Sequence, residues 1–129
     1  MVVVDSSVWI DFFNGVSSRA TDILRELLPA ERLLIGDLIL VEVLSGFREE
    51  ADFEEARRLL AALKYADMVG AEVAVSAARN YRLLRRNGVT VRKTVDVIIA
   101  SFCVLSRCDL LHSDRDLDAM SPHLGLRTL

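Results

Sequence analysis

Four acidic residues lie inside or shortly after apolar stretches of the chain, where an isolated carboxylate is costly: Asp5, Glu42, Asp96 and Asp114. An ionised carboxylate beside a hydrophobic core loses much of its hydration energy unless a partner compensates for it. No basic residue lies within a helical turn of Glu42 along the sequence, whereas a divalent cation compensates several carboxylates at once. Because hard oxygen ligands select Mg²⁺ or Mn²⁺, the four acids predict a site for one of these ions. A zinc site is not indicated, since His112 and His123 have no Cys or His at a matching spacing.

Each of these acids also has an ordinary structural interpretation when it is considered alone. Asp5 could cap a helix, and Glu42 could lie on the solvent face of one. Asp96 could be an acid in a first helical turn, stabilised by the helix dipole. Asp114 and Asp116 could form a polar turn. The positions together favour the metal interpretation, because each lies at the start of an expected element or within an apolar run.

The hydrophobic pattern predicts the elements that would position these acids. Apolar runs rich in β-branched residues alternate with helical patterns, which indicates an α/β fold with a parallel sheet. Strands are expected over residues 2–4, 33–35, 67–70 and 110–111, with a last edge strand over 126–129. Helices are expected over residues 8–13, capped by Ser6 or Ser7, and over 18–28, 38–44, 53–63, 73–84 and 95–105, with a short helix after an acidic turn at 112–116. Sites in such sheets lie at the carboxyl ends of strands, where Asp5 and Asp114 are expected.

Length and charge restrict the class of protein further. The chain has 129 residues, of which 52% are hydrophobic, and this predicts a single folded domain over residues 1–129. The net charge of −3 argues against a general nucleic-acid coating protein. The charge is uneven, however, because residues 1–72 carry a net charge of −7 and residues 73–129 a net charge of +4. A basic half can still bind a phosphate backbone locally.

A run of basic residues with no acid between them supplies most of the positive charge: Arg79, Arg82, Arg85, Arg86, Arg92 and Lys93. These residues could contact phosphates beside the acidic site, or they could form an ordinary solvated helix face. The sequence leaves both interpretations open.

The chain shows no sequence feature of a secreted or membrane protein. Its N-terminus lacks the basic segment of a secretory signal, and the apolar run over residues 97–105 is too short to span a bilayer. Cys103 and Cys108 are expected to be small core residues in a reducing compartment. We therefore expect a soluble, cytoplasmic protein that does not associate with a membrane.

Taken in order, the acidic motifs resemble those of PIN-domain ribonucleases of the VapC kind, which are toxins of VapBC toxin–antitoxin pairs. The segments that carry the resemblance are residues 3–10 (VVDSSVWI), 40–43 (LVEV), 94–100 (TVDVIIA) and 110–118 (LLHSDRDLD). Each motif alone is weak, but all of them occur in the family's order over nearly the whole chain. The resemblance implies a PIN-like three-layer α/β/α sandwich with a short, mostly parallel central sheet.

The same resemblance implies roles for individual residues. It makes Asp5, Glu42, Asp96 and Asp114 the catalytic, metal-binding acids. It implies that Asp116 is an additional metal ligand, that Ser6 is a supporting hydroxyl, and that Thr94 hydrogen-bonds at the start of its helix. The implied activity is Mg²⁺- or Mn²⁺-dependent hydrolysis of RNA, which would leave a 5′-phosphate and a 3′-hydroxyl. The implied partners are a second copy of the chain, forming a homodimer, and a VapB-like antitoxin whose extended segment enters the active-site groove.

Other classes of enzyme fit the sequence less well. A haloacid-dehalogenase phosphatase needs a second Asp two residues after the first, and Ser7 stands there. A response-regulator receiver needs an acidic pair and a late Lys that are not evident, and flap-nuclease-like enzymes are normally longer. The main alternative is a PIN-like module that binds RNA or protein without catalysis.

Overall fold

Four short parallel strands form the middle layer of the protein. The computed structural model describes residues 1–129, and its strands are β1 (Val2–Val4), β2 (Leu33–Gly36), β3 (Lys64–Ala66) and β4 (Asp109–Leu111). Their order in the sheet is β3-β2-β1-β4. The fully buried valines of β1 suit the centre, whereas β3, with exposed Lys64 and Tyr65, lies at an edge. Val3 pairs with Leu34 on one side and with Leu110 on the other, so these strands all end along the same edge of the sheet.

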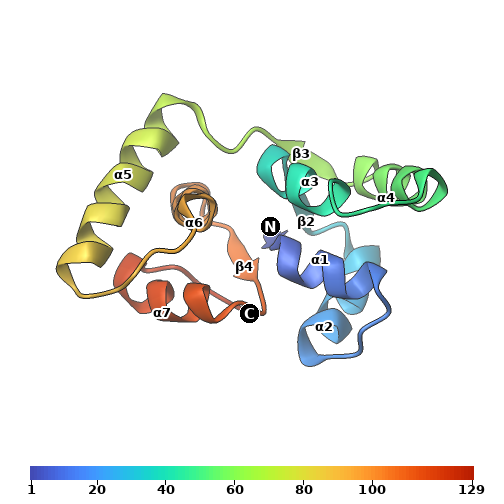
Figure 1. Ribbon diagram of the computed structural model, residues 1–129, viewed down its shortest axis with the longest axis horizontal. Helices are drawn as coiled ribbons and strands as arrows, with labels where there is room; N and C mark the ends of the chain where they lie inside the picture. The colour runs from blue at the N-terminus through green and yellow to red at the C-terminus, as the bar shows by residue number, and fades with distance from the viewer.

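Helices cover both faces of the sheet. On one side lie α1 (Ser6–Phe13), α2 (Arg19–Leu27), α3 (Asp37–Leu44) and α4 (Glu50–Ala61), with the 3₁₀ turn η1 (Leu28–Ala30) after α2. On the other side lie α5 (Gly70–Arg86), α6 (Thr94–Ser106) and α7 (Arg115–Leu124), as Figure 1 shows. The helices change sides because the chain leaves β3 at one edge and returns across the sheet to β4 at the other. The expected three-layer α/β fold is confirmed.

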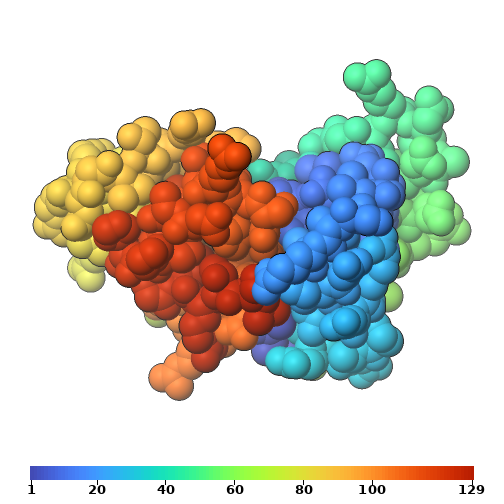
Figure 2. Space-filling model, turned by 90° about the horizontal axis from the view of Figure 1, so that it is seen from below, coloured from blue at the N-terminus to red at the C-terminus, as the bar shows by residue number.

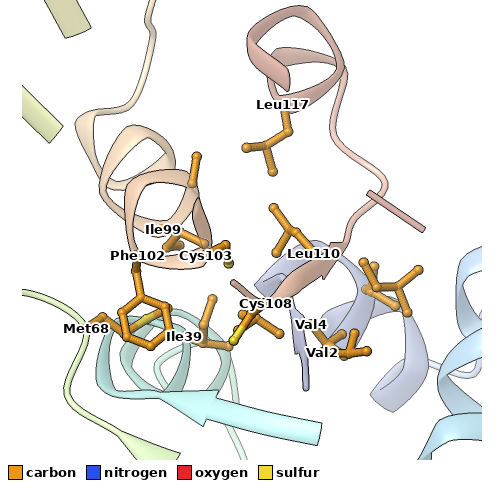
Figure 3. Packing of buried hydrophobic residues seen from close by; sticks show 14 of the residues in the cluster. Val2, Val4, Ile39, Met68, Ile99, Phe102, Cys103, Cys108, Leu110 and Leu117 are labelled. Carbon is orange, nitrogen blue, oxygen red and sulfur yellow. The ribbon is translucent and has the colours of Figure 1, made fainter. Parts of the chain in front are cut away.

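The central helix α6 is held in place by burial on almost all sides. Its residues Ile99, Ala100 and Cys103 are fully buried, and it contacts α5, α7 and β4. Figure 3 shows Ile99 and Cys103 in the same cluster as Met68, which precedes α5, and Ile39 of α3. A helix that is apolar all round must be buried in this way. Any acid on this helix is therefore carried into the interior with it.

The strand expected over residues 67–70 is wrong, because the edge strand ends before it. Met68 turns inward and is completely buried, and its backbone N–H donates to Asp37 Oδ1 at 3.0 Å instead of to a neighbouring strand. Gly36 makes this turn possible, since a Cβ on it would clash with the Met68 side chain. Gly70, with a φ of 75°, then begins α5.

The edge strand expected over residues 126–129 is also wrong in extent. It is reduced to one β-bridge between Leu110 and Thr128. Gly125, with a φ of 68°, ends α7 and directs the last residues back along β4. Figure 2 shows the red C-terminal segment meeting the blue N-terminal segment, where Arg19 Nη1 donates to the carbonyl of Leu129 at 3.4 Å.

Two further expectations concern the cysteines and the membrane. Cys103 and Cys108 are both buried free thiols, as expected, and burial raises the pKa of each. None of the helices combines the length and the apolar character required to cross a bilayer.

Candidate active site

Asp5 is fixed at the junction between β1 and α1. Its backbone N–H donates to the carbonyl of Leu111 in β4 at 2.9 Å, which ties the ends of the two strands together. Its side chain caps α1, since Oδ2 accepts from the backbone N–H of Ser7 at 3.2 Å. The cap is therefore Asp5, and the expectation that Ser6 or Ser7 would cap this helix is wrong. Asp5 is 3% exposed, and its carboxylate has no Lys or Arg within ion-pair distance.

Ser7 contributes to the site in a way that the sequence analysis missed. Its hydroxyl donates to Asp5 Oδ2 at 2.6 Å and accepts from the backbone N–H of Ser113 at 3.3 Å. The same side chain thus holds Asp5 and the loop that follows β4. A hydroxyl two residues after an Asp is a recognisable local pattern, but its contact with Ser113 spans 106 residues and has no sequence signal.

Glu42 reaches the same region from α3. Its half-buried carboxylate accepts a hydrogen bond from the Ser6 hydroxyl at 3.1 Å, across 36 residues of sequence. Burial raises the pKa of Glu42, and the negative charges of Asp5 and Asp114 raise it further. The Ser6 hydrogen bond and the positive charge of Lys93 oppose these effects. Asp5, Asp114 and Lys93 thus all lie near enough to Glu42 for their charges to act on it.

Asp96 is the least compensated of these acids. It lies in the first turn of α6, it is 4% exposed, and its Oδ2 atom is buried without a hydrogen-bond partner. Burial is the main cause that raises the pKa of Asp96 from 3.8 to about 6, followed by the charges of Asp5 and Asp114. A smaller contribution comes from Glu42, while Lys93 acts in the opposite direction.

Asp114 closes the cluster from the loop after β4. It caps α7, since Oδ1 accepts from the backbone N–H of Asp116 at 2.8 Å. Its own backbone N–H donates to His112 Nδ1 at 3.1 Å, a positioning contact that the sequence analysis missed. The His112 ring is buried, and its Nε2 atom lies 3.6 Å from Asp118 Oδ1. His112 therefore fixes the direction in which the chain leaves β4.

The remaining predicted site residues are placed less centrally. Asp116 differs from the four acids because it has an arginine partner, with Arg92 Nε 3.8 Å from its Oδ1 atom. Thr94 begins α6 but is exposed, and no side chain caps this helix, so the expected hydrogen bond of Thr94 is absent. Lys93, at the cap position of α6, is the cation whose charge reaches both Glu42 and Asp96.

The arginines of the basic run divide between a helix and a loop. Arg79, Arg82, Arg85 and Arg86 lie on α5, and Arg92 precedes α6. The Arg85 guanidinium lies over the Tyr81 ring, 5.2 Å from its centroid. All of these arginines are exposed, and none forms an ion pair with the four acids.

The four acids place several carboxylate oxygens in one region, and such a group of negative oxygen ligands can bind a cation. Asp5 and Asp114 raise the pKa of both Glu42 and Asp96, and none of the four predicted acids has a Lys or Arg in ion-pair contact. As their side chains are placed, no three of them surround one point closely enough to enclose an ion. The site is thus a loose cluster of carboxylates at the edge of the sheet where the strands end.

Fold and site together define a class of protein, an α/β/α sandwich with an acidic site at the carboxyl edge of its parallel sheet. The family model of the PIN domain matches residues 2–121. The chain therefore belongs to the PIN-domain family.

Individual relatives agree with this family. The chain is 31% identical over 123 residues to "VapC ribonuclease Mb1587" of Mycobacterium bovis and to "Ribonuclease VapC11" of Mycobacterium tuberculosis, covering 94% of this chain and 92% of each relative. Among solved structures, it is similar to VapBC2 from Rickettsia felis bound to a promoter DNA fragment, with a TM-score of 0.78 at 14% identity over 100% of this chain and 98% of the other. It is also similar to FitAcB from Neisseria gonorrhoeae, with a TM-score of 0.72 at 13% identity over 100% and 96% of the two chains. At these identities, the solved structures support the fold.

The burial of Asp96 predicts a pH-dependent gain in stability for Asp96→Asn in metal-free buffer. Because the pKa of Asp96 in the folded protein is about 6 and its ordinary value is 3.8, ionisation costs stability as the pH rises through this window. At pH 8 the variant should exceed the parent in free energy of unfolding by about 1–3 kcal/mol, and the gain should shrink toward pH 4. Urea unfolding in EDTA measures this, with exposed Asp52→Asn as the control. A variant less stable than the parent at pH 8 would contradict it.

The hydrogen bonds of Ser7 predict a local loss of stability for Ser7→Ala. The variant loses a hydrogen bond to a charged acceptor and leaves the Ser113 N–H without its partner. The free energy of unfolding should fall by about 1.5–3 kcal/mol. Amide hydrogen exchange should show faster exchange at Ser113 than in the parent. An unchanged rate at Ser113 would mean that Ser7 does not hold this loop.

Proposed function

We propose that this chain is a Mg²⁺- or Mn²⁺-dependent endoribonuclease and the toxin of a VapBC-type toxin–antitoxin pair. One observation carries the proposal: Asp5, Glu42, Asp96 and Asp114 gather at the carboxyl edge of the sheet without a basic residue in ion-pair contact. The similarity to relatives named VapC ribonucleases supports RNA as the substrate.

The donor set fits a hard divalent cation. The acids offer only oxygen ligands, and the unpartnered buried Oδ2 atom of Asp96 is a position that a cation would satisfy. Asp5, Asp96 and Asp114 would hold the ion, with Glu42 and Asp116 completing its surroundings. A bound ion would lower the pKa of a water molecule and stabilise charge on the leaving oxygen. Because no three of the acids surround one point closely enough to hold an ion, some of their side chains would have to rotate for the ion to bind.

The protein's own residues would orient the reaction. Ser7 holds Asp5 and Ser6 holds Glu42 through the hydrogen bonds described above. Glu42, whose pKa is raised, is suited to accept a proton from the attacking water. Lys93, whose charge reaches Glu42 and Asp96, would contact a non-bridging phosphate oxygen. Attack by water in line with the leaving 3′ oxygen would leave a 5′-phosphate and a 3′-hydroxyl.

Partners and location are part of the same proposal. Similar solved structures include VapBC2 of Rickettsia felis and a toxin–antitoxin complex from Klebsiella pneumoniae, with a TM-score of 0.69 at 19% identity over 91% of this chain and 90% of the other. We infer a VapB-like antitoxin, a homodimer and a cytoplasmic location. The alternative, a PIN-like module that binds RNA or protein without catalysis, would lack metal-dependent cleavage.

Removing a central acid should abolish metal-dependent cleavage of RNA. Asp5→Ala and Asp96→Asn should each lower the rate by about 100-fold or more, because each removes a charged oxygen ligand. Cleavage of labelled RNA with Mg²⁺ or Mn²⁺, and with EDTA, measures this. The exposed Asp52→Asn variant should cut like the parent. If the Asp5 and Asp96 variants cleave RNA as fast as the parent, these acids are not part of the catalytic site.

The basic face of α5 should contribute to RNA binding through phosphates. Charge reversal of Arg85 and Arg86 should weaken binding of single-stranded RNA and lower the slope of log affinity against log salt by about 1.4. Fluorescence anisotropy at several salt concentrations gives both quantities. Unchanged affinity and slope would favour the alternative that these arginines form an ordinary solvated face.

A further inference from the structure

A groove with a volume of about 410 Å³ lies between α5 and α6. Its walls are mainly apolar, with Ala77, Ala78 and Tyr81 from α5 and Ile98 from α6. The alanines are short, so the helices leave a hollow between them here. The volume lies within the range of about 300–1,000 Å³ that small-molecule pockets occupy in proteins.

The groove is positively charged at its rim. Arg82 and Arg85 both line it, one helical turn apart, and no acidic residue does. The Arg85 guanidinium over the Tyr81 ring places two flat groups together at the wall. Flat aromatic and guanidinium groups are the surfaces on which nucleobases stack in single-stranded nucleic-acid sites. An occupant that combines a planar, weakly polar group with negative charge is therefore complementary to the groove.

The groove adjoins the acid cluster at the start of α6. Thr94 lines the groove, and Asp96 follows it by two residues in the same helix. Lys93, directly before Thr94, is close enough to Glu42 and Asp96 to influence both. Figure 1 shows the loop that joins the end of α5 to the start of α6. The neighbouring residues Lys93 and Thr94 therefore connect the acid cluster with the groove.

We propose that the groove between α5 and α6 receives one unpaired nucleobase of the RNA, next to the phosphate that is cleaved. Tyr81 and Arg85 stack on the base, and Arg82 contacts a neighbouring phosphate. A base that is paired and stacked within a duplex cannot enter, so the site selects single-stranded RNA. This inference rests on the proposed nuclease function, and it assigns a specificity role to residues outside the acid cluster.

Filling the groove without changing charge tests the proposal. Ala78→Phe places a ring in the groove, whereas Val75→Phe adds the same ring on an exposed part of α5 that does not line it. The probe is a short, unstructured RNA of mixed sequence, compared with the same RNA carrying one abasic nucleotide at each position in turn. Binding is measured by anisotropy without metal, and cleavage is measured with Mg²⁺ or Mn²⁺. Thermal unfolding establishes that both variants are folded.

We expect Ala78→Phe to weaken binding and cleavage of the intact RNA by about 5- to 150-fold, and Val75→Phe to match the parent. One abasic nucleotide beside the cut should weaken binding and cleavage by the parent by a similar factor. The same abasic nucleotide should not weaken binding or cleavage by Ala78→Phe any further. Because a folding defect in Ala78→Phe would not reproduce this position-specific effect, the abasic series in the parent stands as a second test.

Three results would overturn the groove proposal. The first is equal RNA binding by Ala78→Phe and Val75→Phe. The second is a parent whose activity is insensitive to abasic positions beside the cut. The third is a change in oligomeric state with unchanged RNA binding, which would assign the groove to a second copy of the chain. If the parent binds RNA through the groove but never cuts it, the groove inference survives and the nuclease function fails.

Discussion

Repulsion among four clustered carboxylates, of which Asp5 and Asp96 are buried, is the constraint on which this structure depends. Asp5, Glu42, Asp96 and Asp114 are close enough for the charge of one to raise the pKa of another, and Asp96 is almost inaccessible to water. Removing such groups from water and placing them together costs stability. The fold tolerates the cost because hydrogen bonds from Ser6 and Ser7 fix part of the cluster, and because a cation can supply the missing charge.

The parallel sheet brings these four carboxylates together at one of its edges. β1 and β4 are neighbours and end at the same edge, so the residues that follow them meet although they lie far apart in sequence. The backbone bond from Asp5 to Leu111 fixes this junction. Burial of α6 against the sheet then carries Asp96 into the same region. Core packing and site geometry are therefore consequences of one arrangement.

The uneven charge of the chain also acquires a structural meaning. Asp5 and Glu42 come from the acidic half, on the side of α1 to α4, whereas Asp96 and Asp114 come from the half that also carries the basic run. The acid cluster lies where these two halves meet. Lys93 lies close enough to Glu42 and Asp96 to influence both, so a positive group for a phosphate chain stands beside the negative ligands for a metal.

The sequence alone determined the α/β class. It also showed which acids lie in unfavourable surroundings, because a carboxylate within an apolar run can be recognised from its neighbours in the sequence. The sequence also determined most helices and the strands β1, β2 and β4, since their hydrophobic patterns are local. The tertiary structure decided the position of β3, the reduction of the C-terminal strand to one bridge, and the roles of Ser7 and His112. The groove between α5 and α6 likewise exists only in the folded protein. The physical reason is that these features depend on contacts between residues far apart in sequence, such as Gly36 with Met68 and Ser7 with Ser113. Such contacts form only when the chain folds, and they leave no periodic pattern in the sequence.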